Sequence, residues 1–231
     1  MKKKEAFRRL AQEVHKCSLC ETLYSSPGYP KGDHLCHDKR VAPAVMNQWN
    51  LRTGNYDAKI LILGQDFGIV DDHSLAFETQ TDERLNYFLG ADIGRCFFTN
   101  AACCYRQNKS SGPLNRVWLT LCVNRFLREE LEILRPKVII ALGDAAFRSL
   151  NSCRCSRLVL PDGPSAASFS ALVNSHQPAQ LLLMSDGPSA AETQIPVFPV
   201  YHPSAKPINR SLAAQKTDWQ CILDALSRSP L

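Results

Sequence analysis

The sequence predicts an α/β fold with a mostly parallel sheet. Two short, continuous apolar runs, residues 58–63 and 137–142, are typical of strands that are buried on both faces. Segments with apolar residues at helical spacing lie between the strand-like runs, and this alternation indicates parallel strands joined by right-handed crossovers. A chain of 231 residues with 45% hydrophobic content can bury one substantial core. We therefore predict a single domain over residues 1–231.

The individual elements follow from local patterns. Helices are predicted where apolar residues recur every three or four positions, and Pro136 stops the longest of them. Their expected ranges are 4–15, 81–89, 114–134, 145–150 and 211–226. Strands are expected at 58–63, 96–99, 137–142 and 195–201. The prolines of the last strand indicate an edge position, because proline cannot donate a hydrogen bond to a neighbouring strand.

The segment from about 151 to 194 has no clear period. It carries the same six residues twice, Asp-Gly-Pro-Ser-Ala-Ala, at 162–167 and at 186–191. Two copies are too few for a repeat architecture. We interpret the segment as an inserted excursion, a hairpin or flap with two similar turns.

Composition restricts the class of protein. The basic start runs into further charge rather than an apolar signal core, and no stretch is apolar enough to span a membrane. We therefore expect a protein of the cytoplasm, nucleoid or nucleus that is not secreted and binds no membrane. Because thiols stay reduced there, the ten cysteines favour a metal or cluster role for some of them over disulfides.

The net charge of +5 permits a polyanionic partner without requiring one. Its distribution is more informative, because Lys206, Arg210 and Lys216 follow a predicted strand end at which ligands commonly bind. Lysine and arginine at such places can hold phosphates. The alternative for each residue is a solvated charge that serves solubility.

Two short motifs place chemistry at the ends of two predicted strands. Gly64-Gln65-Asp66-Phe67-Gly68 follows the strand 58–63, and His202-Pro203-Ser204 follows the last strand. In an open parallel sheet, ligands bind outside the carboxyl ends of the strands. We therefore expect the Asp66 carboxylate and the His202 imidazole to face one pocket. The alternatives without a catalytic role are a helix cap for Asp66 and an ordinary strand-end histidine for His202.

Four cysteines have the arrangement of a ligand set. Cys17 and Cys20 have the two-residue spacing that lets both thiolates reach one metal or cluster, and Cys104 and Cys122 flank the start of the long helix. The spacing leaves zinc and an iron-sulfur cluster both open. Other candidate ligands are Cys36, His37 and, in place of Cys104, Cys103.

These residues together resemble the uracil-DNA glycosylase superfamily, above all its iron-sulfur branch, usually called family 4. That branch has an N-terminal helix leading to Cys-x-x-Cys and a strand ending in Thr-Asn-Val-Val-Lys-Cys, which is similar to Thr-Asn-Ala-Ala-Cys-Cys at 99–104. Its Pro-Lys-Val-Ile-Ile-Ala-Leu-Gly strand is matched at 136–143, and its Tyr-His-Pro-Ser at 201–204. Residues 21–56 and the excursion are not covered by the resemblance.

The resemblance implies a three-layer α/β/α fold with a central four-stranded, mostly parallel sheet. It also implies a structural four-iron, four-sulfur cluster on Cys17, Cys20, Cys104 and Cys122, with zinc as the alternative cofactor. The implied partner is DNA containing uracil or a related deaminated base, on which the protein acts as a monomer. A catalytically weak or inactive cluster protein that only binds nucleic acid is the alternative.

The resemblance also assigns roles. Asp66 orients or deprotonates the attacking water, and His202 donates to the uracil O2 as the base becomes anionic. Asn100 reads the uracil edge, and Phe77 stacks on the flipped base. Further expected substrate-binding residues are Gly64, Gln65, Phe67, Gly68 and Ser204.

Departures from the family pattern sharpen some of these expectations. The Gln65-Asp66 pair differs from the Gly-Glu-Ala-Pro-Gly of family 4 and resembles the Gly-Gln-Asp-Pro-Tyr-His of family 1, in which the aspartate activates water. Phe67 replaces a proline, and Gly68 stands where family 1 has a tyrosine that excludes the thymine methyl group. After His202, the loop with Lys206, Pro207 and Ile208 is the expected wedge into the duplex, and Arg210 is expected to bind DNA.

Overall fold

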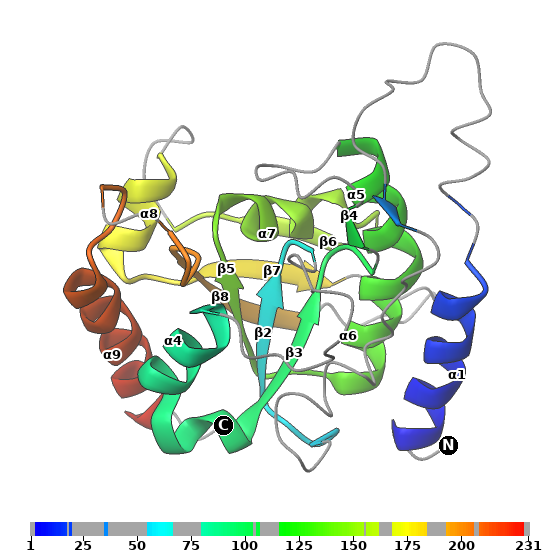
Figure 1. The fold of residues 1–231 in the computed structure, drawn as a ribbon, viewed down its shortest axis with the longest axis horizontal. Helices are drawn as coiled ribbons and strands as arrows, with labels where there is room; N and C mark the ends of the chain where they lie inside the picture. The colour runs from blue at the N-terminus through cyan, green and yellow to red at the C-terminus, as the bar shows by residue number, and fades with distance from the viewer. Residues whose placement is uncertain are drawn as a thin grey trace.

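The computed structural model of the protein describes residues 3–17, 19, 35–36, 55–66, 80–103, 105–106, 116–154, 156–161, 168–183, 193–205 and 208–228. A six-stranded sheet lies at its centre, with the strand order β3-β2-β5-β8-β7-β6 (Figure 1). The strands are β2 (Ile60–Gly64), β3 (Cys96–Asn100), β5 (Val138–Leu142), β6 (Ser156–Val159), β7 (Ala179–Leu183) and β8 (Thr193–Val200). A separate antiparallel pair joins β1 (Leu35–Cys36) to β4 (Tyr105–Arg106).

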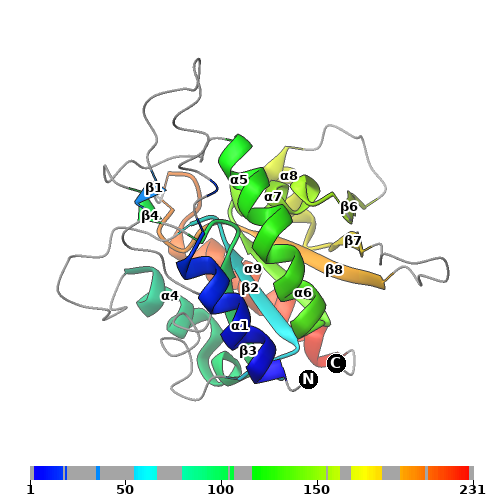
Figure 2. The same ribbon diagram turned by 90° about the vertical axis from the view of Figure 1, so that its right-hand side faces the viewer.

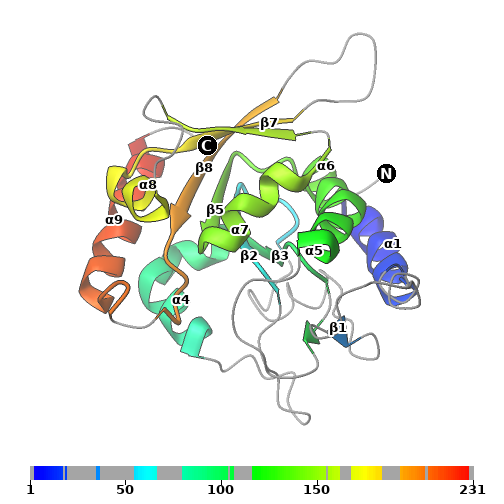
Figure 3. The same cartoon turned by 90° about the horizontal axis from the view of Figure 1, so that it is seen from above.

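Helices cover both faces of the sheet. They are α1 (Lys3–His15), α4 (Gln80–Leu89), α5 (Arg116–Cys122), α6 (Arg128–Leu134), α7 (Asp144–Ser149), α8 (Phe169–Ser175) and α9 (Leu212–Arg228). Figures 2 and 3 show α1, α6 and α7 on one side of the sheet and α4 and α9 on the other. The 3₁₀ segments η2 (Gly90–Arg95) and η4 (Leu150–Ser152) follow α4 and α7.

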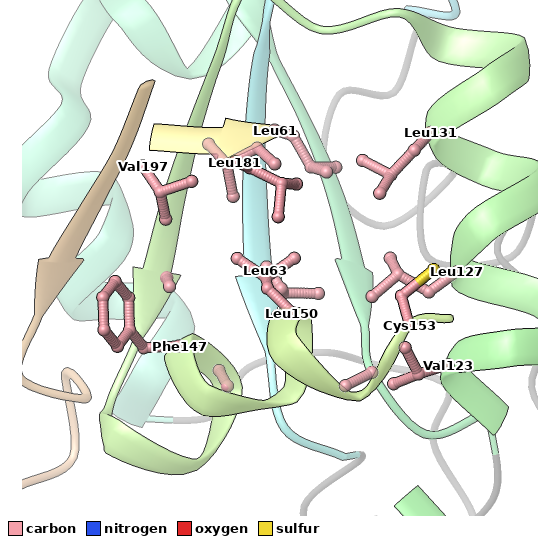
Figure 4. Close-up of a cluster of buried hydrophobic side chains, with 14 of the residues drawn as sticks. Leu61, Leu63, Val123, Leu127, Leu131, Phe147, Leu150, Cys153, Leu181 and Val197 are labelled. Atoms are coloured by element: carbon pink, nitrogen blue, oxygen red, sulfur yellow. The ribbon is translucent and has the colours of Figure 1, made fainter. Parts of the chain in front are cut away.

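Alternation along each buried strand divides the core into two parts. On β2, Leu61 and Leu63 pack with side chains of α5, α6 and α7 and of the segments that follow α5 and α7, as Figure 4 shows for Leu127, Leu131 and Leu150. Ile60 and Ile62, which point the other way, pack in a second cluster with side chains of α4 and α9. A strand with apolar residues at every position is therefore required, which is why these runs were legible in the sequence. The α/β fold class and the three-layer arrangement are confirmed.

The sheet is wider than the four strands expected from the sequence. The four expected strands, β3, β2, β5 and β8, are parallel to one another. The excursion adds β7 and β6, both antiparallel to their neighbours, and it carries α8 between them. Of this segment, residues 156–159 and 179–183 form an antiparallel pair, as a hairpin does, but the pair belongs to the central sheet and is not a separate flap. Both copies of the repeated hexapeptide lie outside the described residues.

The expected edge position of β8 is also wrong. β8 lies between β5 and β7, but it pairs with β7 over residues 193–197 and with β5 over residues 197–200. Pro196 therefore lies opposite Gln180 of β7, and Pro199 lies opposite Ala141 of β5. Each proline occupies a position at which only one neighbouring strand is paired, so an inner strand tolerates both.

The long helix after residue 115 contains one irregular turn. The segment η3 (Val123–Leu127), between α5 and α6, has π-helical hydrogen bonding. Within it, Asn124 donates to the carbonyl oxygen of Ser152 and accepts from the amide of Arg154, at 2.9 and 2.7 Å. The helix ends at Leu134, and the next residue, Arg135, has a φ of 51°. Pro136, the predicted stop, follows directly. Among the described residues, no helix is long and apolar enough to cross a membrane.

Candidate active site

The ends of β2 and β3 are joined by backbone hydrogen bonds. The amide of Ala101 donates to the carbonyl oxygen of Gly64, and the amide of Ala102 donates to that of Gln65, both at 2.9 Å. This pairing places the buried Asn100 side chain directly over Gly64. A Cβ built on Gly64 would lie 2.0 Å from Asn100 Oδ1, so only glycine leaves room for the amide in this position. The structure thus brings together two residues that the sequence predicted separately.

Asp66 follows two residues after β2 and is half-buried. Its Oδ2 atom lies 3.5 Å from Nε2 of the half-buried Gln65, which is a weak hydrogen bond. Phe67, Gly68 and Phe77, which were expected to complete this part of the site, lie outside the described residues. The carboxylate is therefore placed at the carboxyl end of the sheet, on the strand next to the one that carries Asn100.

His202 lies beyond the end of β8 in a defined protonation state. Its Nδ1 atom accepts a hydrogen bond from the backbone amide of Ser204 at 3.2 Å and lies 2.7 Å from the Ser204 hydroxyl. Because a backbone amide can only donate, Nδ1 carries no proton and the ring proton lies on Nε2. Burial lowers the pKa of His202 to about 4. The residue is therefore a neutral imidazole with an Nε2–H donor at neutral pH.

Gly143 separates the aspartate strand from the histidine strand. It directly follows β5, which lies between β2 and β8. Parallel strands spaced about 4.8 Å apart place β2 and β8 about 10 Å from each other. Gly143 donates its amide to the carbonyl oxygen of Val200 at 2.7 Å and has a φ of 88° and a ψ of 164°, which essentially only glycine adopts. It adds no side chain between Asp66 and His202.

A family model matches most of the chain. It is the model of the uracil DNA glycosylase superfamily, and it matches residues 51–225. The chain belongs to this superfamily. Membership indicates a uracil-DNA glycosylase-like function and fits a DNA substrate. A search of curated proteins finds no match to the chain.

The loop that carries His202 in this glycosylase-superfamily chain is held by an arginine that the sequence did not single out. Arg84 of α4 donates from Nη1 to the carbonyl oxygen of the buried Pro203. The two residues are 119 positions apart. A single arginine in an amphipathic helix resembles an ordinary surface charge, so the sequence contains no signal for this contact.

The expected DNA-binding residues after His202 lie in different surroundings. Ile208 is 90% exposed, as an inserting side chain requires, whereas Lys206 lies outside the described residues. Arg210 donates to both oxygens of the buried Asp218 and, at 2.8 Å, to Asn174 Oδ1. Its guanidinium is thus engaged within the protein. The expectation that Arg210 contacts DNA stays a prediction, and the structure shows a role in holding the loop.

Two of the four expected cysteine ligands lie near each other. Cys122 ends α5 and is buried, and Cys17 follows α1 and is half-buried. Burial raises the pKa of the Cys122 thiol to about 11, the backbone amide of Cys103 lowers it by donating to the sulfur, and Cys17 raises it again. Cys20 and Cys104 lie outside the described residues. Within the described part of the chain, no three ligand-type side chains are grouped to hold a metal ion.

Two rival ligands are also placed. Cys103 is buried in a small apolar cluster between α1 and η3, with Leu10, Val14 and Phe126. The backbone of Cys36 in β1 pairs with Tyr105, the residue after Cys104. His37 lies outside the described residues.

A buried acid beside β3 was not predicted from the sequence. Glu130 of α6 is 1% exposed, and neither carboxyl oxygen has a regular hydrogen-bond partner among the described residues. Burial raises its pKa to about 8, and the nearby Thr99 side chain lowers it in part. Thr99 directly precedes Asn100. Glutamate in a predicted amphipathic helix is normally exposed, so no pattern distinguishes this one.

Proposed function

We propose that the protein removes uracil, or a related deaminated base, from DNA by hydrolysing the N-glycosidic bond. The observation that carries the proposal is the neutral His202 ring with its proton on Nε2, at the same edge of the sheet as Asp66 and Asn100. A hydrolytic glycosylase needs a negative charge near the sugar and a hydrogen-bond donor near the departing base. These residues supply both.

The reaction breaks the bond between the sugar C1′ and the base nitrogen, and water supplies the hydroxyl group that C1′ gains. Asp66 orients this water, accepts its proton and stabilises the positive charge that develops on the sugar. The electron pair of the broken bond stays on the base. His202 stabilises the resulting anion by donating from Nε2, while Ser204 holds Nδ1 as an acceptor.

Recognition of the base is assigned to the end of β3. An amide side chain offers both a donor and an acceptor, which matches the edge of uracil. The absence of a Cβ on Gly64 leaves room for the Asn100 amide at this position. The backbone amides of Gln65 and Asp66 are proposed as further donors, and Phe77 as the ring that stacks on the extruded base.

A four-iron, four-sulfur cluster on Cys17, Cys20, Cys104 and Cys122 remains part of the proposal. Of this set, Cys17 and Cys122 lie among the described residues, and there the buried Cys122 sulfur receives a backbone N–H next to the Cys17 thiol. Hydrogen bonds to sulfur are a normal feature of cluster sites. The cluster would supply a structural cross-link between the end of α1 and the end of α5. No catalytic step depends on it.

The test is excision from a labelled oligonucleotide that contains a single uracil. Free uracil is detected by mass spectrometry, and the abasic site is detected by alkaline strand cleavage. We expect one abasic site for each uracil released, with single-stranded as well as with duplex DNA. Binding of this DNA, and of matched oligonucleotides that contain hypoxanthine or xanthine instead of uracil, without release of any of the three bases would instead identify a nucleic-acid binding protein.

A further inference from the structure

The excursion contacts the segment around His202 at several points. Phe169 of α8 packs edge-on against Tyr201, with ring centroids 5.4 Å apart. Asn174 of the same helix accepts from Arg210 at 2.8 Å. His176, directly after α8, places its Nε2 atom 2.9 Å from Asp218 Oδ1. These contacts lie before and after the loop that carries Ile208.

Asp218 is the centre of this contact. It lies on α9, and its side chain is 1% exposed. Its carboxylate accepts hydrogen bonds from Nε and Nη2 of Arg210 and faces His176. A buried carboxylate with several donors has little freedom to rotate, and removing any one donor leaves an oxygen poorly satisfied. Arg210 is therefore held by Asp218 and Asn174, two residues after the exposed Ile208.

The loop is fixed at its start as well. Arg84 holds the carbonyl oxygen of Pro203, and the amide of Ala205 donates to the carbonyl oxygen of His202 at 2.8 Å. Ile208 thus lies in a segment that is anchored at Pro203 and again at Arg210, although it is itself 90% exposed. A side chain that enters a duplex must push against stacked bases, and an anchored loop transmits that force better than a free one.

We propose that α8 and His176 of the excursion are a brace that positions the inserting loop, with Asn174 and His176 acting through Arg210 and Asp218. The proposal rests on the proposed glycosylase function and adds a role for residues 168–176. These are positioning residues, because Asn174 contacts Arg210 and His176 contacts Asp218, which in turn binds Arg210. The brace matters for extrusion of a base from a duplex. A single strand, in which no partner base must be displaced, does not require it.

The test compares duplex and single-stranded DNA that contain the same uracil. In the double variant Asn174→Ala/His176→Ala, we expect kcat/KM on the duplex to fall about tenfold, and activity on the single strand to stay within about twofold. His176→Gln keeps an N–H donor toward Asp218 and should restore most of the duplex activity of His176→Ala. Ser170→Ala, at an exposed position of α8, is the matched control and should leave both activities unchanged.

Hydrogen exchange gives a readout that does not depend on excision. Amides of residues 208–211 should exchange about tenfold faster in the double variant than in Ser170→Ala, while β2 and β5 stay protected. Equal losses on both substrates with unchanged exchange at 208–211 would overturn the brace. Unchanged activity on both substrates would do the same. If the unaltered protein excises no uracil, the glycosylase proposal fails, and the exchange result alone decides whether the brace exists.

Discussion

Replacing Gly64 by alanine tests whether Asn100 selects the base. The added Cβ would lie 2.0 Å from Asn100 Oδ1, whereas real Cβ atoms essentially never approach closer than 3.0 Å. The amide must therefore move by about 1 Å (3.0 minus 2.0). Because Oδ1 is at the end of a side chain, β2 and β3 can stay in place while the amide turns away. A displacement of about 1 Å at a substrate-holding group lowers the rate on the order of 100-fold.

The assay is kcat/KM for uracil excision by Gly64→Ala, Asn100→Ala and the double variant. Since Asn100→Ala removes the atom that clashes, the double variant should match Asn100→Ala within about twofold, and the two effects should not multiply. The free energy of unfolding of Gly64→Ala should change by less than about 1 kcal/mol. Wild-type activity in Gly64→Ala, or two losses that multiply, would refute the assignment of Asn100.

Three further predictions concern titratable groups and cysteines. The ring signals of His202 should titrate in nuclear magnetic resonance with a midpoint near pH 4 rather than 6.5, and excision should show no ionisation of this residue between pH 5 and 8; a midpoint above 6 would contradict the neutral donor. Glu130 keeps its proton up to about pH 8 in the folded protein, whereas the unfolded chain releases it near 4.5, so the contribution of Glu130 to the free energy of unfolding should fall as pH rises between these values, by at most about 5 kcal/mol. Because the lowered pKa of His202 contributes a rise up to about pH 6.5, the fall is measured as the difference between the unaltered protein and Glu130→Gln. Glu130→Gln should remove this slope, and an unchanged slope in urea titrations would show that another group causes it. If the proposed cluster is bound, the unaltered protein purified without oxygen should contain iron and inorganic sulfide, and Cys122→Ser should lose both; zinc in the unaltered protein would contradict the cluster.

The four parallel strands and the edge they share could be predicted because the physics is local. A strand buried on both faces needs an uninterrupted apolar run, and Ile60–Gly64 and Val138–Leu142 are such runs. The site motifs directly follow two of the strands, so their positions were fixed once the sheet was parallel. Asp66, Asn100 and His202 were found at that edge for this reason.

The strands of the excursion were not predicted, because they form only through pairing with strands elsewhere in the fold. The strand Ser156–Val159 has four residues, and only Leu158 is buried. An alternation of apolar and polar residues cannot be recognised over so short a segment. Ala179–Leu183 is a short apolar segment that forms a strand by pairing with β6 and β8. The prolines of β8 predicted an edge strand, because the sequence does not show that β8 pairs with β7 and with β5 over different residues.

The residues that hold the His202 loop were invisible for a related reason. Asp218 lies in an amphipathic helix, where a carboxylate is normally solvated, and its partners Arg210 and His176 are 8 and 42 positions away. Sequence spacing alone cannot indicate that these three meet in a buried position. Arg84 and Pro203 are an even more distant pair.

The central claim is that Asp66 activates water for cleavage of a glycosidic bond. The most direct measurement is single-turnover excision of uracil by Asp66→Asn, together with the dissociation constant for the same uracil-containing DNA. The account predicts a rate that falls at least about 100-fold, because a general base contributes that much or more, with a dissociation constant unchanged within about threefold. An Asp66→Asn variant that excises uracil at the wild-type rate would contradict it.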